Sequence, residues 1–245
     1  MKLNLVTTAL SSVALASLVS LTLSSNAQAQ TFAGNSSGTW GDPNPGANTS
    51  PQFSGVGTNT FTWGDPNGFG VGANQLIFNG NTFSAGIDTL FQVGDLTYFN
   101  GTTTIGTTVA SVPLNVQLAF ATPSVFSEVF SFDFNLVSTP NTGTPEQNAD
   151  SVYPISSFGS RSFSFGGTDY TLQLTGFSQD GGATTVSEFR VLEGATTTAA
   201  VFGRITAAPS KDVPEPATIG GLGLLGVYLM SRRRGQQDKA TSVDS

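Results

Sequence analysis

Residues 130–136 have the sequence FSFDFNL, and this stretch decides the fold class of the chain. Phenylalanine or leucine alternates in it with a smaller or polar residue. Because successive side chains of a β-strand point to opposite faces of a sheet, one face of this segment is apolar and the other is polar. This pattern is typical of a strand that lies with one face against a protein core.

The same alternation recurs on both sides of this segment. Further strands are expected at residues 114–120, 163–165, 170–174 and 189–191. Turns between strands are favoured by Asn79-Gly80, Asn100-Gly101, Gly166-Gly167 and Asp180-Gly181-Gly182. Helical periodicity is absent from this part of the sequence. The middle of the chain is therefore expected to form about ten to twelve short strands.

Nineteen phenylalanines suit an apolar core between two packed sheets, because their rings bring no polar group that needs a partner. The long connection from Ser138 to Ser151 favours a jelly-roll or Greek-key arrangement over a meander. We predict an all-β antiparallel β-sandwich over residues 55–208. A polar segment at residues 30–54 is expected to precede it, and a linker at residues 209–213 to follow it.

The composition argues against several kinds of function. The chain has no cysteine and no histidine, which excludes disulfides, thiolate nucleophiles, imidazole-based triads and zinc sites built on these residues. Its net charge of −7 would repel the phosphates of a nucleic acid. No nucleic-acid partner is therefore expected.

The remaining residue types offer little for catalysis. The lysines, Lys2, Lys211 and Lys239, all lie outside the expected sandwich, so a Ser-Lys arrangement is not expected. Glu128 and Asp133 would lie on opposite faces of one strand, ~17 Å apart, which is too far for the carboxylate pair of a glycosidase. We predict that the protein is not an enzyme and has no catalytic residues.

Residues 1–29 have the pattern of a secretory signal peptide. Lys2 is followed by an apolar stretch, and Ala27-Gln28-Ala29 supplies the small residues that a signal peptidase accepts before Gln30. Cleavage is expected between Ala29 and Gln30. An uncleaved N-terminal anchor is the alternative interpretation.

A second targeting pattern follows the domain. Val213-Pro214-Glu215-Pro216 leads into an apolar run, and Arg232, Arg233 and Arg234 follow it as a stop-transfer cluster. A transmembrane helix at about 217–231 is expected, but residues 216–231 would reach only ~24 Å as a helix, short of the ~30 Å hydrocarbon core. The arginines would stay on the cytoplasmic side, which places residues 30–213 outside.

This order resembles the PEP-CTERM protein-sorting signal, which would span residues 214–234. Pro214, Glu215 and Pro216 carry the motif, the apolar run the helix, and the arginines the stop. The resemblance implies an exosortase as partner, a membrane-inserted precursor with transient inner-membrane association, and a host that makes exopolysaccharide. The polar tail at 235–245 departs from the family pattern. A plain tail anchor with an accidental Pro-Glu-Pro triplet is the alternative.

Residues 55–206 resemble the choice-of-anchor K domain of bacterial surface proteins, including those of cyanobacteria. The segments that carry the resemblance are residues 55–58 with 61–64, 91–101, 170–172 and 189–194. The resemblance implies a domain fused to interchangeable sorting tails and brings no catalytic motif.

A short repeat offers the first candidate binding residues. Thr39-Trp40-Gly41-Asp42-Pro43-Asn44 recurs at residues 62–67 as Thr-Trp-Gly-Asp-Pro-Asn. Trp40 and Trp63, together with Tyr153, could stack on sugar rings. The interpretation that we favour is a turn formed by Asp-Pro-Asn, with the tryptophan as its apolar lid.

Calcium is the one cofactor for which the sequence offers candidate ligands. Asp42, Asp65, Asp150 and Asp180 could supply oxygen ligands from the loops at the ends of the sandwich. The alternative is that each aspartate serves its own turn. No EF-hand pattern is present, and no metal ligand is assigned.

Together these patterns predict an exported protein of the cell surface or extracellular matrix. Its expected role is structural or interactive and is linked to exopolysaccharide and biofilm. Its partners would be signal peptidase, exosortase and extracellular polysaccharide. The alternative is a carbohydrate-binding module, with or without dependence on calcium.

Overall fold

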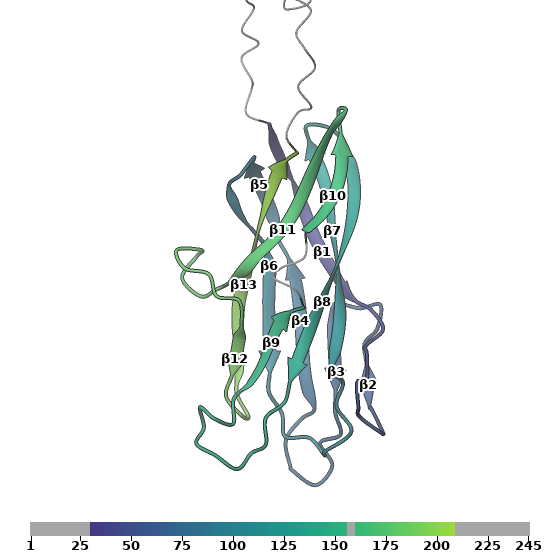
Figure 1. The fold of residues 1–245 in the computed structure, drawn as a ribbon, viewed down its shortest axis with the longest axis vertical. Coiled ribbons are helices and arrows are strands. Elements are labelled where there is room, and N and C mark those ends of the chain that lie inside the picture. Colours follow the sequence, from purple (N-terminus) through teal and green to yellow (C-terminus); the bar gives the residue numbers. More distant parts are fainter. Residues whose placement is uncertain (1–29, 156–159, 209–245) are drawn as a thin grey trace, which may run out of the picture.

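The computed structural model describes residues 30–155 and 160–208, and within them it is all-β. Two antiparallel sheets pack face to face along a long axis (Figure 1). The first sheet has the order β12 (Phe189–Val191), β9 (Asp150–Pro154), β8 (Phe126–Val137), β7 (Ser111–Thr122), β1 (Thr31–Trp40) and β5 (Thr82–Gly86). The predicted all-β class and the sandwich of antiparallel sheets are confirmed.

The second sheet has seven strands. Their order is β10 (Ser160–Phe165), β11 (Thr168–Ser178), β13 (Thr196–Ala207), β6 (Leu90–Phe99), β4 (Asn74–Gly80), β3 (Thr60–Trp63) and β2 (Phe53–Ser54). The chain crosses between the sheets repeatedly, for example from β5 to β6 and from β6 to β7. The described strands number thirteen, slightly more than the sequence indicated.

The core lies between the sheets and is built by the alternation seen in the sequence. In β8, Phe130, Phe132 and Phe134 point inward and are at most 2% exposed. Each such ring contributes about 1.5–3 kcal/mol by leaving water. Rings from the two sheets interlock, as where Phe32 of β1 meets Tyr170 of β11 edge to face at 5.0 Å. The phenylalanines therefore fill the core, as expected.

The expected N-terminal boundary of the domain is wrong. Residues 31–40, placed in a polar segment before the sandwich, form β1, which lies between β5 and β7. The inward positions of β1 include Gly34 and Gly38, which hide the apolar alternation. A Cβ atom at Gly34 would lie 2.1 Å from the carbonyl oxygen of Ala119, and one at Gly38 would lie 2.4 Å from the ring of Phe78. Close packing requires glycine where a strand signal would otherwise show.

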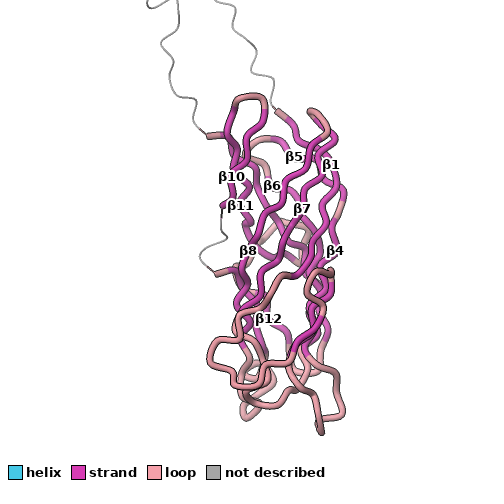
Figure 2. Tube along the Cα trace, turned by 90° about the vertical axis from the view of Figure 1, so that its right-hand side faces the viewer, coloured by secondary structure: helices cyan, strands magenta, loops and turns pink. Residues whose placement is uncertain are grey.

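The two ends of the sandwich differ. Thr31 pairs with Gly86, and the amide of Asp88 donates to the carbonyl of Ile205. The N-terminal end of β1 and the C-terminal end of β13 therefore lie at the same end of the sandwich. We call this end the terminal pole. At the opposite end, the loop pole, the connections 100–110, 138–149 and 192–195 gather (Figures 1 and 2).

Several expectations concern residues that the structure does not describe. These are the signal peptide at 1–29 with its cleavage site, the linker at 209–213, the sorting signal at 214–234 and the tail at 235–245. The described part of the chain contains no helix with the length and apolarity needed to cross a membrane.

Candidate functional site

A cavity of about 280 Å³ opens at the loop pole. Its walls come from the loop after β6, the loop after β8, the first residue of β9 and the turn after β12. Its lining combines threonine and serine hydroxyls and asparagine amides with apolar groups such as Ile105 and Pro140, and it includes two carboxylates, Asp150 and Glu193. We call it the loop-pole pocket.

Asp150 is the buried carboxylate of this pocket. It begins β9, and its side chain points inward because it is two residues from the core residue Val152. Its Oδ1 accepts hydrogen bonds from the backbone N of Thr139, at 2.7 Å, and from the Thr139 hydroxyl, at 3.1 Å. Burial raises the pKa of Asp150 to about 6, and the negative charge of Glu193 adds to this, against the hydrogen bonds from Thr139 and Ser138.

Glu193 is held by the segment that follows β6. The Thr102 hydroxyl donates to its Oε1. Backbone hydrogen bonds of Asn100 stabilise the turn that contains Glu193. The backbone N of Asn100 donates to Ala195 O at 3.0 Å, and Gly194 N donates to Asn100 O at 2.8 Å. Tyr98, two residues before Asn100 on β6, is buried and close enough to both carboxylates to feel their charge. Burial, and then the charges of Asp150 and Glu193, raise the pKa of the Tyr98 hydroxyl well above its ordinary value.

The two carboxylates of the loop-pole pocket have only neutral hydrogen-bond donors. Across residues 30–155 and 160–208, the single ion pair joins Arg190 to Glu188 at 3.8 Å. The negative charge of Glu193 disfavours the charged form of Asp150. The arrangement can therefore bind a proton, a cation or a ligand that donates hydrogen bonds.

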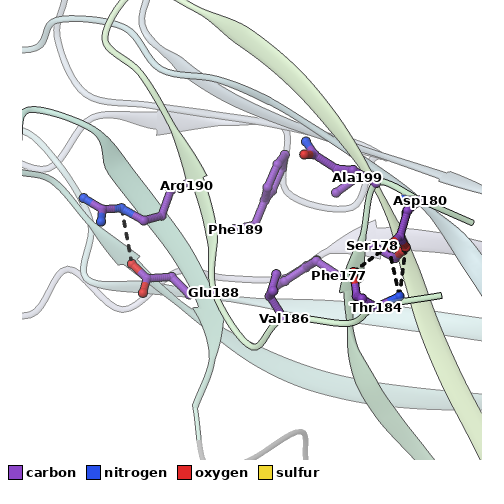
Figure 3. Close-up of a pocket in the computed structure, with 10 residues that line it drawn as sticks. Phe177, Ser178, Asp180, Thr184, Val186, Glu188, Phe189, Arg190 and Ala199 are labelled. Atoms are coloured by element: carbon purple, nitrogen blue, oxygen red, sulfur yellow. Dashed lines mark hydrogen bonds and ion pairs between the residues drawn. The ribbon is translucent and has the colours of Figure 1, made fainter. Parts of the chain in front are cut away.

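A second cavity, of about 270 Å³, lies along the side of the sandwich and is shown in Figure 3. Phe177, Val186 and Phe189 form its apolar part. Glu188 and Arg190 lie at one side of it and are about half exposed, so their ion pair adds little stability. We call this cavity the side pocket.

The acidic residue at the other side of this pocket is committed to its own loop. Asp180 accepts from the Ser178 hydroxyl at 2.6 Å and from the Thr184 hydroxyl at 2.6 Å (Figure 3). It also accepts from Thr184 N at 3.0 Å. The hydrogen bond from Ser178 makes the largest contribution, and together these hydrogen bonds lower the pKa of Asp180 to about 2. Asp180 therefore serves its loop, as the turn interpretation of this residue predicts.

The stacking hypothesis is wrong for both tryptophans. Trp40 and Trp63 are 0% and 1% exposed, so neither offers a ring face to a ligand. Both point inward from strand ends and pack against Phe61, with ring centroids 6.2 and 5.7 Å away. Tyr153, on the outer side of β9, is partly exposed and is the aromatic candidate that remains.

The four aspartates considered for calcium are not brought together. Asp65 forms a turn by accepting from Asn67 N at 3.0 Å, and Asp42 is exposed in the first copy of the repeat. The described residues contain no group of three or more acidic side chains placed to hold a metal ion. Of the four, Asp150 alone lines the loop-pole pocket.

Glu193 was missed by the sequence analysis. It is 43 residues from Asp150, and only the pairing of β9 with β12, in which Asp150 lies opposite Val191, brings the two together. No spacing in the sequence signals that pairing. The Leu192-Glu193-Gly194 turn after a strand was the one local hint of a loop position.

Comparison with known proteins adds no relative: no family model and no curated protein matches the chain. The two resemblances given above rest on sequence pattern, and they stay predictions. The function is therefore argued from the site and from the ends of the chain.

Proposed function

We propose that the protein is exported, sorted by an exosortase and displayed at the cell surface or in the extracellular matrix. There it acts as a β-sandwich with a structural or interaction role linked to exopolysaccharide. The observation that carries this proposal is that the two ends of the sandwich have different features. The described chain enters and leaves at the terminal pole, whereas the loop-pole pocket lies at the other end.

This difference between the two ends suits a domain that is attached to the cell surface through its C-terminal segment. The sequence after Ala208 leads to the sorting pattern, so whatever holds the C-terminal part holds the terminal pole. The loop pole would then face away from the attachment. Loops presented at the free end of a rigid scaffold are the usual place for recognition.

The chemistry of the exposed surface supports a polysaccharide partner. The loop-pole pocket offers Thr103, Thr104, Thr108 and Asn141 beside its carboxylates, and such groups hydrogen-bond to sugar hydroxyls. Twelve acidic residues and three arginines give residues 30–208 a net charge of −9. That charge favours solubility outside the cell and bridging to acidic polymers through divalent ions.

A carbohydrate-binding module is the second candidate function. The loop-pole pocket favours it, now without the tryptophans and with Tyr153 as the one aromatic candidate. A panel of immobilised bacterial polysaccharides tests it with purified protein, and Asp150→Asn with Glu193→Gln should weaken retention. Equal retention of this double variant would contradict binding through the pocket.

The sorting step is tested by alanine substitution of Pro214, Glu215 and Pro216. We expect the variant to accumulate as a full-size precursor in the inner membrane, because the exosortase would no longer recognise it. Alanine substitution of Ser210, Lys211 and Asp212, just upstream, is the matched control and should mature normally. If the Pro-Glu-Pro variant matures as fast as the control, exosortase sorting is refuted.

A further inference from the structure

We propose that Asn67 is a site of spontaneous deamidation, in which the backbone nitrogen of Gly68 attacks the side chain of Asn67. This inference goes beyond the display role, which requires no covalent change within the folded domain. It stands on three observations: the residue that follows the asparagine in each copy of the repeat, the exposed turn around Asn67, and the contrast with the two other Asn-Gly steps of the chain.

The reaction needs only the chain and water. The Gly68 nitrogen forms a bond to Cγ of Asn67 and gives up its proton, while the Cγ–Nδ2 bond breaks and ammonia leaves with that proton. The product is a cyclic succinimide. Water then opens the ring at one of its two carbonyl carbons, and residue 67 becomes aspartate or isoaspartate. No oxidant is needed, because every carbon keeps its oxidation state.

The two copies of the repeat differ in the residue that follows the asparagine. Asn44 is followed by Pro45, whereas Asn67 is followed by Gly68. Proline has no N–H, so its nitrogen cannot attack the side chain before it in this way. Glycine has an N–H and no Cβ, which leaves its nitrogen unhindered. The repeat therefore places a reactive asparagine in its second copy only.

The backbone around Asn67 forms an exposed turn. Phe69 N donates to Pro66 O at 3.1 Å and closes the turn, with Asn67 and Gly68 as its two central residues. Both central residues are exposed. Gly68 has a φ of +88°, as expected for glycine at the third position of a type II turn. A Cβ atom added at Gly68 would have no neighbour within 4 Å, so the turn is uncrowded.

The two reacting groups are free of other partners. In the part of the chain that the structure describes, neither the side chain of Asn67 nor the nitrogen of Gly68 makes a hydrogen bond. To react, the peptide group between the two residues must rotate until its nitrogen approaches Cγ. Because the turn is exposed and a single backbone hydrogen bond closes it, this rotation disturbs little of the structure.

The other two Asn-Gly steps are held by their surroundings. Asn79 and Gly80 lie in β4 and are paired with β6, so the same rotation would break the sheet. Asn100 is 0% exposed, and the backbone N of Gly101 already donates to Asn74 Oδ1 at 2.9 Å. The three steps contain the same two residues, and the fold leaves only the first of them free to react.

The reaction would add a negative charge at the loop pole. Asp65, two residues before Asn67, is joined to the loop after β6: Thr104 N donates to Asp65 O at 2.8 Å, and Asp65 N donates to Thr107 Oγ1 at 2.9 Å. Thr104 lines the loop-pole pocket. Deamidation would therefore replace a neutral amide by a carboxylate on a turn that is attached to a wall of this pocket.

The test is incubation of the purified full chain, in detergent, at mildly alkaline pH, followed by digestion at acidic pH and mass spectrometry of the separated peptides. The peptide that contains Asn67 should be converted to aspartyl and isoaspartyl forms. The peptides that contain Asn44, Asn79 and Asn100 should stay unchanged. Isoaspartate is the diagnostic product, because direct hydrolysis of the side chain yields aspartate alone.

Two controls separate the effect of the fold from that of the sequence. In concentrated urea the contrast should disappear, and Asn79 and Asn100 should react as well, because the unfolded chain frees all three Asn-Gly steps. Asn67→Ser should abolish the more acidic form that accumulates on isoelectric focusing of the folded chain. Asn79→Ser is the matched variant and should leave that form in place.

Three outcomes would overturn the proposal. One is conversion of Asn79 or Asn100 in the folded chain as fast as that of Asn67. Another is an unchanged Asn67 in the folded chain under conditions in which it reacts in urea. The third is the appearance of aspartate at position 67 without isoaspartate, which would exclude attack by the Gly68 nitrogen.

Discussion

Asp150 and Asp180 line cavities of similar volume, about 280 and 270 Å³, but their surroundings shift their pKa values in opposite directions. Asp150 is buried at the loop pole, near a second carboxylate, and forms no ion pair with another residue of 30–155 or 160–208. Asp180 is exposed and accepts hydrogen bonds from the hydroxyls of its own loop. The loop-pole pocket therefore holds unfavourable charge that a ligand can relieve, whereas the side pocket is satisfied by itself.

The largest expected effect concerns one apolar side chain near each pocket, buried in one case and exposed in the other. Tyr98→Ala should lower the free energy of unfolding by about 3–5 kcal/mol, because it removes a buried ring that stacks on Trp63. Val186→Ala, at a side-pocket residue that is 54% exposed, should change it by less than about 0.5 kcal/mol. Urea unfolding at neutral pH measures both. Equal losses would show that the loop-pole pocket is not built on the core.

The next effect should have opposite signs at the two aspartates. At pH 8, Asp150→Asn should stabilise the protein by roughly 1–2 kcal/mol, because it removes a charge that burial penalises. Asp180→Asn should destabilise it, because a carboxylate that its hydrogen bonds favour is lost. Urea midpoints of the two variants decide the matter. A destabilised Asp150→Asn variant would contradict the charge penalty.

The pH dependence of the wild type sharpens the same contrast. The pKa of Asp150 is about 6 in the folded protein and 3.8 ordinarily, so the folded state binds the proton more tightly. The stability from this group is fully present below about pH 4 and is lost as the pH rises to about 6 and beyond. The Asp180 contribution runs the other way: it is present above about pH 4 and is lost as the pH falls toward 2.

Unfolding measured from pH 4 to pH 8 separates the two contributions, since only that of Asp150 titrates in the window. Asp150→Asn should remove most of the decline across this range, and Asp180→Asn should leave it unchanged. Tyr98 and Glu193, the other groups that face Asp150, are present in both variants. A decline that survives in Asp150→Asn would assign the titration to another carboxylate.

The smallest expected effects come from polar pairs at the two rims. Thr102→Val should cost about 0.5–1.5 kcal/mol, because Glu193 loses the hydroxyl that donates to it. Glu188→Gln should cost less than about 0.5 kcal/mol, because its ion pair with Arg190 is half exposed. Thermal unfolding of the two variants in parallel measures the difference. A larger loss for Glu188→Gln would reverse the ranking of the rims.

The sequence predicted those parts of the fold in which inward side chains are large. Phe130, Phe132 and Phe134 mark β8 without ambiguity, and the Asp65 turn follows from local chemistry. β1 was missed because Gly34 and Gly38 occupy inward positions where neighbouring atoms leave no space for a Cβ. Glycine signals a loop when it is read locally, but here the backbone of β7 in the same sheet requires it at Gly34, and the ring of Phe78 in the second sheet requires it at Gly38.

The candidate site was only half predictable. Asp150 could be named as an oxygen donor, but its burial depends on which face of β9 meets the core. Glu193 joins it through strand pairing over 43 residues, which no local pattern signals. Whether Trp40 and Trp63 point inward also depends on the sheets that surround them.

The proposal of a sorted, displayed protein is tested most directly by the intact mass of the native polypeptide in each cell fraction. We predict a chain that begins at Gln30, has lost residues from its C-terminal end and is found outside the cytoplasm. A full-length chain from Met1 to Ser245 in the cytoplasm would contradict it.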